Sequence, residues 1–179
     1  MRRKGHDNGV AHIGLADPNE CRRTVAVTLG ADLAVDPRGP DVGTALRDAT
    51  EGKGFSAVIL AVSSIAPIRG IFTLSQEGAY ALLAPGAHVK VFSGLDPGDT
   101  TFALDARALF YQGLSPVGTV NSMPQHNREA LVLIVSGAVD VEPLVTARVS
   151  LSRIREGFGL AMSRPRIHQK VVIEPGHVE

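Results

Sequence analysis

PGAHVKVFSGLDPG, residues 85–98, is the stretch that decides the fold of this chain. Pro85-Gly86 predicts the end of an apolar helix, because proline cannot continue a helix and glycine takes the positive φ of a tight stop. The β-rich run 89–92 predicts a short buried strand. Ser93-Gly94-Leu95 then ends the strand at its carboxyl end, where open parallel sheets bind ligands. The stretch therefore predicts a helix stop, a strand and one wall of a ligand site.

The same helix-then-strand order recurs on both sides of residues 85–98. Further strands are expected at residues 10–16, 33–35, 55–62, 114–120, 144–149 and 168–174, with an edge strand at 101–104. Helices are expected after Asp17, Pro40, Pro67, Ser122 and Leu151. Strands that alternate with helices at this spacing form βα units with right-handed crossovers. The sequence therefore predicts the α/β class with a parallel sheet.

Local signals sharpen several of these elements. Asp17-Pro18-Asn19-Glu20 predicts a helix start with Asp17 as N-cap, proline at the first helical position and glutamate at the third. Gly30 predicts the end of that helix. The continuous apolar run 55–62 predicts a strand covered on both faces. The long helical stretch after Pro67 is expected to break near Gly78.

Composition limits the classes of function. The 179 residues fit one domain, or one domain with a small appendage. The formal net charge is zero, tryptophan is absent and aromatics make up 4% of the residues, which argues against nucleic-acid partners and anionic membranes. Cys21 is the single cysteine, so a reducing compartment, the cytoplasm, is expected. Residues 1–9 are polar and expected to be disordered, and no apolar segment of signal or membrane-span length follows them.

Several short stretches together resemble the medium-chain, zinc-type alcohol and polyol dehydrogenases. They are HIGLADP (12–18), LGADLAVD (29–36), APG (84–86), FSGL (92–95), VGT (117–119), REAL (128–131), VEPLVT (141–146) and KVVI (170–173). Their order and spacing match this NAD(P)-dependent family from about residue 10 to 175, with wording closest to its sorbitol-like and threonine-like branches. The resemblance implies a Rossmann-type sheet that binds NAD.

The resemblance covers only the later part of that family's chain. No G-x-G-x-x-G precedes Val10, so the first strand of the dinucleotide fold and its glycine-rich turn are expected to be missing, together with the amino-terminal catalytic domain. Residues 10–142 are expected to form a partial dinucleotide-binding domain. Residues 143–179 are expected to form a strand-helix-strand unit that returns toward the absent catalytic domain.

The resemblance implies that Asp17 hydrogen-bonds the adenosine ribose and favours NAD over NADP, because its carboxylate would repel a 2′-phosphate. Arg22, one turn into the next helix, could support the same ribose. The plainer reading makes Asp17 only a helix cap, and both roles can coexist, since one oxygen can cap while the other accepts a hydroxyl.

Further cofactor contacts are implied at the ends of other strands. Val62 and Ser63 would border the adenosine side, although a serine-capped turn explains them equally well. Backbone groups of Ser93-Gly94-Leu95 and of Thr119-Val120 would bind the nicotinamide carboxamide, or these residues simply pack at strand ends. Lys170 would lie near the pyrophosphate, against the plainer alternative of a solvated surface lysine.

No catalytic residue and no metal ligand is assigned in this sequence. The six histidines are scattered and have no partner cysteines, and the zinc site of the resembled family uses residues of the missing domain. Neither a G-x-S-x-G elbow nor a Walker loop occurs. We therefore expect no zinc in this chain.

Loss of the first strand has a physical consequence. Strands 10–16 and 55–62 would lose their shared neighbour, so they either pair directly or leave an open gap. The pyrophosphate would lose a helix N-terminus, so NAD binding is expected to be weak.

Two functions remain open. One is the cofactor-binding part of an NAD-dependent alcohol or polyol dehydrogenase, inactive alone and completed by a catalytic-domain polypeptide. The other is a non-catalytic nucleotide-binding or self-association module. The resemblance implies that the segment around 101–104 and the last sheet strand pair across a dimer interface, so this edge could support a homo-oligomer.

Overall fold

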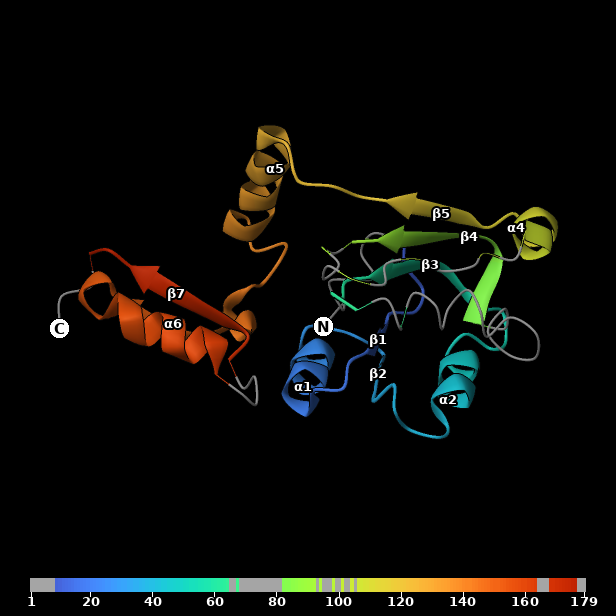
Figure 1. Cartoon of the computed structure of the whole chain (residues 1–179), viewed down its shortest axis with the longest axis horizontal. Coiled ribbons are helices and arrows are strands. Elements are labelled where there is room, and N and C mark those ends of the chain that lie inside the picture. The colour runs from blue at the N-terminus through green and yellow to red at the C-terminus, as the bar shows by residue number, and fades with distance from the viewer. Residues whose placement is uncertain are drawn as a thin grey trace. The chain divides into compact units, whose positions relative to one another are not determined.

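The computed structural model describes residues 9–64, 67, 82–92, 94, 98, 101, 104, 106–163 and 168–176. Every sheet formed by these residues is parallel, and helices flank the strands, so the predicted α/β class is confirmed (Figure 1). The chain divides into two compact units, residues 1–39 with 124–179, and residues 40–123.

The described elements follow one another in the order strand, helix, strand over most of the chain. They are β1 Gly14–Ala16, α1 Glu20–Thr28, β2 Leu33–Val35, α2 Val42–Asp48, β3 Phe55–Leu60, β4 Leu83–Val91, α4 Ala106–Gln112, β5 Ser115–Gly118, α5 Pro124–Val135, η4 Glu142–Leu144, β6 Val145–Ser150, η5 Leu151–Arg153, α6 Ile154–Met162 and β7 Lys170–Glu174. None of the described helices is long and apolar enough to cross a membrane.

The first sheet pairs β1 with β2, with Leu15 opposite Ala34. β1 is shorter than the predicted strand 10–16, and β2 has the predicted bounds. A reciprocal contact ties the two strands where they begin. The Ile13 amide donates to Asp32 Oδ2 at 2.9 Å, and the Asp32 amide donates to the Ile13 carbonyl at 2.8 Å. The amide and the carbonyl of Ile13 are therefore both hydrogen-bonded before the pairing of β1 with β2 begins.

Helix α1 begins two residues later than predicted, so Asp17 as N-cap was wrong. Asn19 is the N-cap, because its side chain accepts the Arg22 amide at 3.3 Å. Asp17 instead accepts the Asn19 amide at 2.7 Å and closes a turn before the helix. An asparagine competes as well as an aspartate for a cap position, which is why the pattern was ambiguous. Gly30, with φ 109°, ends the helix as predicted.

The second sheet has the order β3-β4-β5, with β4 in the middle (Figure 1). Its core is a small cluster of buried apolar side chains, namely Leu60, Leu83, Ala87, Val89 and Leu114. Val89 is fully buried, as expected for the central strand of the sheet. β3 is less covered than predicted, because Ile59 remains 64% exposed.

Pro85-Gly86 was predicted to stop a helix, and this was wrong, because both residues lie inside β4. The pairing of β4 with β3 shifts register between Leu83, opposite Phe55, and His88, opposite Ala57. Proline lacks an amide proton and is tolerated at such irregularities, and Gly86 takes the positive φ of 78° found there. The dipeptide therefore marks a bulge that lengthens the strand.

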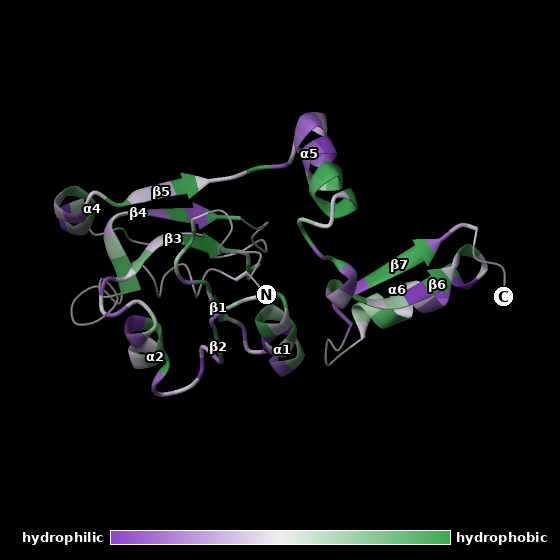
Figure 2. Cartoon of the chain, turned by 180° about the vertical axis from the view of Figure 1, so that it is seen from behind, coloured by the Kyte–Doolittle hydropathy of each residue, from purple (hydrophilic) through white to green (hydrophobic). Residues whose placement is uncertain are grey.

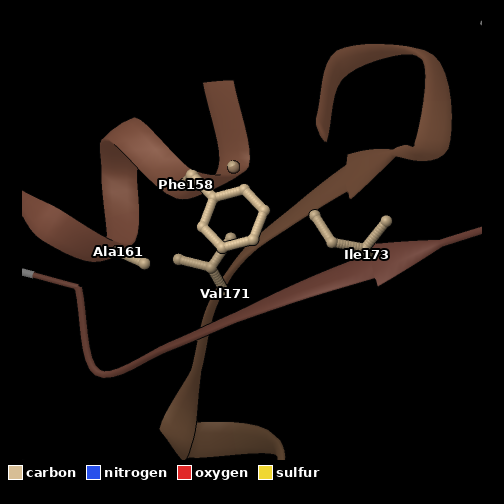
Figure 3. Close-up of a pocket in the computed structure, with 5 residues that line it drawn as sticks. Phe158, Ala161, Val171 and Ile173 are labelled. Atoms are coloured by element: carbon tan, nitrogen blue, oxygen red, sulfur yellow. The ribbon is translucent and has the colours of Figure 1, made fainter. Parts of the chain in front are cut away.

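The carboxyl-terminal part is a β6–α6–β7 unit in which the two strands pair in parallel. Gly157 is buried in α6, and a Cβ atom there would lie 2.6 Å from Ile173 Cδ1. A pocket of about 90 Å³ opens beside it, lined by Gly157, Phe158, Ala161, Val171 and Ile173 (Figure 3). Arg148 on β6 forms ion pairs with Glu142 of η4 at 2.8 Å and with Glu174 of β7 at 2.6 Å, and so links these three elements.

Helix α5 begins at Pro124, inside the capping signature predicted from Ser122, and ends before Gly137, which has φ 70°. All twelve of its residues are exposed, including the apolar run 131–135. Figure 2 shows this apolar half of α5 in green and its polar first half in purple.

β1 and β3 are edge strands of their sheets. Direct pairing of these two strands is not among the pairings formed by the described residues. Three other predictions fall outside the described residues: the state of residues 1–8, the helix that follows Pro67 and its break near Gly78. Residues 102 and 103 of the predicted edge strand 101–104 also lie outside them, and Thr101 and Leu104 are not in a strand.

Candidate functional site

The first candidate region is the carboxyl end of the β1–β2 sheet. Asp17 directly follows β1, and its amide extends the ladder by donating to the Val35 carbonyl at 3.1 Å. Its carboxylate accepts the Asn19 amide on Oδ1, and Arg22 Nη1 on Oδ2 at 3.3 Å. The sequence named Asp17 and Arg22 as a pair, and the structure brings them together.

The Asp17 carboxylate has capacity for a further donor. An ionised carboxyl group offers about four acceptor sites, and two are used here. The side chain is 20% exposed, and that of Arg22 is 38% exposed, so the pair is held but reachable. This donor and acceptor set fits a ribose whose hydroxyls donate to the carboxylate.

Asp36 lies at the matching position after β2 and is the most heavily bonded carboxylate of this region. Arg38 holds it in a bidentate pair, with Nε on Oδ1 at 2.9 Å and Nη2 on Oδ2 at 2.6 Å. Arg23 Nη1 lies 3.6 Å from Oδ2. The Arg38 side-chain and backbone hydrogen bonds hold the pKa of Asp36 well below its ordinary value.

Sequence reasoning assigned no role to Asp36, although it quoted the stretch LGADLAVD that ends in it. The available signal was positional, because Asp36 directly follows β2 as Asp17 directly follows β1. Its arginine partners come from α1 and from the loop after β2, and that convergence is a tertiary feature.

The second candidate region is the carboxyl end of the β3-β4-β5 sheet. The Phe92 amide donates to the Leu60 carbonyl at 3.0 Å, and both the amide and the hydroxyl of Thr119 donate to the Val91 carbonyl at 3.1 Å. Val62 follows β3 and is half-buried, whereas Ser63 is exposed. The ends of these strands therefore form one edge, as their parallel order requires.

The remaining predicted site residues differ in exposure, and two of them lie outside the described residues. Thr119 and Val120 are exposed, and Val120 is 85% exposed. Gly94 is described and exposed, whereas Ser93 and Leu95 lie outside the described residues. Lys170 opens β7 with its side chain exposed, and its carbonyl accepts the Thr146 hydroxyl at 3.2 Å. Asp17, Arg22 and Lys170 belong to one compact unit, and the other predicted residues belong to the second.

Within the described ranges, no three histidine, cysteine, aspartate or glutamate side chains form a group that could hold a metal ion. Cys21 is a free, exposed thiol on α1.

Comparison with known proteins begins with a negative result, because no protein-family model matches the chain. Among curated proteins, L-threonine 3-dehydrogenase of Chromobacterium violaceum is 22% identical over 156 residues, covering 87% of this chain and 42% of that protein. An uncharacterized zinc-type alcohol dehydrogenase-like protein of Escherichia coli is 27% identical over 156 residues, covering 87% and 40%. The chain thus spans less than half the length of these relatives.

Solved structures show that the fold of this chain is shared. A protein assigned as a zinc-binding dehydrogenase from Sinorhizobium meliloti, bound to NADP, superposes with a TM-score of 0.78 at 19% identity, covering 97% of this chain and 48% of that one. The 2R,3R-butanediol dehydrogenase of Bacillus subtilis gives 0.74 at 20% identity, covering 97% and 46%. The predicted resemblance to the NAD(P)-binding portion of zinc-type dehydrogenases is confirmed, and the Rossmann-like fold is shared.

Proposed function

We propose that this chain is the cofactor-binding part of a zinc-type, NAD-dependent alcohol or polyol dehydrogenase. The observation that carries the proposal is the Asp17 carboxylate at the carboxyl end of β1, held by Arg22 and by the Asn19 amide with acceptor capacity left over. The similarity to the curated L-threonine 3-dehydrogenase supports it.

Each end of the cofactor has its own set of residues in this proposal. Asp17 and Arg22 take the adenosine ribose, and Val62 and Ser63 border the adenosine. Backbone groups of residues 93–95, together with Thr119 and Val120, take the nicotinamide carboxamide, and Lys170 takes the pyrophosphate. When bound, the nicotinamide supplies the hydride acceptor at C4. This chain binds and orients it, and the zinc and the proton relay belong to protein outside this chain.

The proposal favours NAD over NADP. A 2′-phosphate would be placed against the Asp17 carboxylate, and the nearby arginines already have carboxylate partners, Arg22 at Asp17 and Arg38 at Asp36. A neighbouring structure carries NADP, so the choice needs a direct measurement.

Calorimetric titration of the purified chain with NAD⁺ and NADP⁺ is that measurement. We expect weak binding of NAD⁺, with a Kd on the order of 1 mM because the chain carries no glycine-rich phosphate turn, and weaker binding still of NADP⁺. Asp17→Asn should abolish the preference for NAD⁺. Asp48→Asn, an exposed carboxylate on α2, serves as the matched control and should change nothing. If wild type and Asp17→Asn have the same Kd for NAD⁺ and the same preference for NAD⁺ over NADP⁺, the ribose assignment is contradicted.

One observation favours a second candidate, a non-catalytic self-association module. The apolar run 131–135 of α5 is exposed throughout, and Val135 is 85% exposed. Light scattering coupled to size exclusion separates a dimer from a monomer. An NAD⁺ and polyol assay, with and without zinc and an added catalytic-domain polypeptide, separates the enzyme part from the module. Turnover only with the added polypeptide supports the first function, and a stable homo-oligomer without nucleotide binding supports the second.

The proposal also includes the bounds of two domains and the cellular compartment. Residues 10–142 serve as the partial dinucleotide-binding domain, and residues 143–179 form the strand-helix-strand unit that returns toward the catalytic domain. A single reduced cysteine suits the cytoplasm.

A further inference from the structure

Asp36 sits at the centre of a charged cluster to which no role has been assigned. Arg38 pairs with both of its carboxylate oxygens, at 2.9 and 2.6 Å, and the Arg38 amide donates to Oδ1 at 3.0 Å. Arg23 approaches Oδ2 at 3.6 Å. The Asp36 side chain is 31% exposed and that of Arg23 is 20% exposed, whereas that of Arg38 is 70% exposed, so only the Arg23 side of the cluster is shielded from water.

Arg23 and Arg38 also donate hydrogen bonds to the turn that carries Asp17. Arg23 Nη1 donates to the Asp17 carbonyl at 2.8 Å. Arg38 Nη2 donates to the Pro18 carbonyl at 3.0 Å. Two adjacent carbonyls of the turn are therefore held by two guanidiniums that share one carboxylate.

The charges of the cluster explain why that carboxylate matters. Three arginines, Arg22, Arg23 and Arg38, surround two carboxylates, Asp17 and Asp36, which leaves one positive charge in excess. Without Asp36 the excess becomes two. Arg23, which is bonded to the Asp17 carbonyl, would then lose its carboxylate partner while staying on the residue that carries the Asp17 carboxylate.

We propose that Asp36 is a positioning residue that holds Arg23 and Arg38 on the Asp17–Pro18 turn and keeps them off the Asp17 carboxylate, so that this carboxylate stays open to a ribose hydroxyl and the site rejects a 2′-phosphate. The inference rests on the proposed role of Asp17 at the ribose. It adds a second specificity determinant, which acts through arginines and touches no ligand itself.

The test compares wild type with Asp36→Asn, Asp36→Glu and the control Asp48→Asn. Binding of 5′-AMP and of adenosine 2′,5′-bisphosphate is measured by NMR titration of the full chain. We expect Asp36→Asn to weaken 5′-AMP binding and to strengthen binding of the bisphosphate, which shifts their affinity ratio by about tenfold. Asp36→Glu should restore part of the wild-type ratio, because it retains the charge. A merely structural role would lower both affinities together, so an unchanged ratio in a folded Asp36→Asn variant overturns the proposal.

A ligand-free measurement separates this inference from the proposed function. The Asn19 amide reports the Asp17 carboxylate, because it donates to Asp17 Oδ1 at 2.7 Å. We expect its chemical shift and hydrogen-exchange protection to change in Asp36→Asn and to be largely restored in Asp36→Glu. If the wild type binds neither nucleotide and this amide still responds, the ribose function fails while the positioning role stands. An amide that is the same in wild type and both variants overturns the positioning role.

Discussion

Gly54 lies against the backbone of Leu83 so closely that a Cβ atom on Gly54 would stand 2.6 Å from the Leu83 carbonyl carbon. The amide nitrogen of Ala84 would be 2.7 Å away, and Gly54 has a φ of +78°. The Gly54 amide is also held by the hydroxyl of the buried Thr50 at 3.1 Å. The start of β3 can therefore reach β4 only through a residue without a side chain.

Gly54→Ala should destabilise the β3-β4-β5 sheet by about 2–4 kcal/mol, because it adds steric overlap with rigid backbone to an unfavourable φ. Denaturant unfolding gives the change. Gly43→Ala is the matched control, since a Cβ atom there meets nothing within 4 Å, and it should be neutral or stabilise α2 by up to about 0.5–1 kcal/mol. Equal unfolding midpoints for the two variants would contradict the close approach.

Gly157→Ala should cost less than Gly54→Ala. Its Cβ atom would meet Ile173 Cδ1, the end of a side chain that can turn into the pocket beside it (Figure 3). We expect a loss of about 1–2 kcal/mol, reduced by the better helix propensity of alanine. Gly159→Ala, in open space on the same helix, should stabilise by about 0.5–1 kcal/mol. If both variants stabilise the protein, α6 is not packed on Ile173.

Asp32→Ala should weaken the start of the β1–β2 sheet, because the Ile13 amide loses its acceptor at 2.9 Å. The side chain is exposed, so the cost is about 0.5–1.5 kcal/mol. Hydrogen exchange at Ile13 measures this directly and should become faster. Asp32→Asn keeps an oxygen acceptor and should retain most of the protection of the Ile13 amide. Loss of protection in both variants would show that the charge of Asp32, and not its hydrogen bond to Ile13, protects this amide.

Asp36 gives the protein a pH dependence with a definite sign. Its pKa is lowered in the folded state, chiefly by the hydrogen bonds from Arg38, below the ordinary value of 3.8. The folded state therefore binds the proton less tightly than the unfolded state does, and the stabilisation is complete above about pH 5. It is lost as the pH falls below 3.8 toward the folded pKa. Wild type should exceed Asp36→Asn in stability at pH 7, and the gap should narrow on acidification; a gap that stays constant down to pH 2 would contradict the ion pairs.

Sequence patterns predicted the elements whose signals are local. Leu33–Val35 and the Gly30 stop needed only β propensity and a positive φ, and both are confirmed. Pro85-Gly86 was misread because the same dipeptide suits a helix stop and a strand bulge, and only the pairing of β4 with β3 distinguishes them. Asp17 and Arg22 were named from the resemblance to the dehydrogenase family, and their contact is local because Arg22 lies one turn into the helix that follows Asp17. Asp36 was missed because its partners Arg23 and Arg38 converge only after β1 and β2 pair.

The ribose assignment of Asp17 is the central claim, and mapping nucleotide contacts by amide chemical shifts during an NAD⁺ titration tests it most directly. The account predicts shifts at residues 17–23 and at Thr119 and Val120, with the first group absent in Asp17→Asn and retained in Asp48→Asn. Saturation of NAD⁺ binding with no change at residues 17–23 would contradict it.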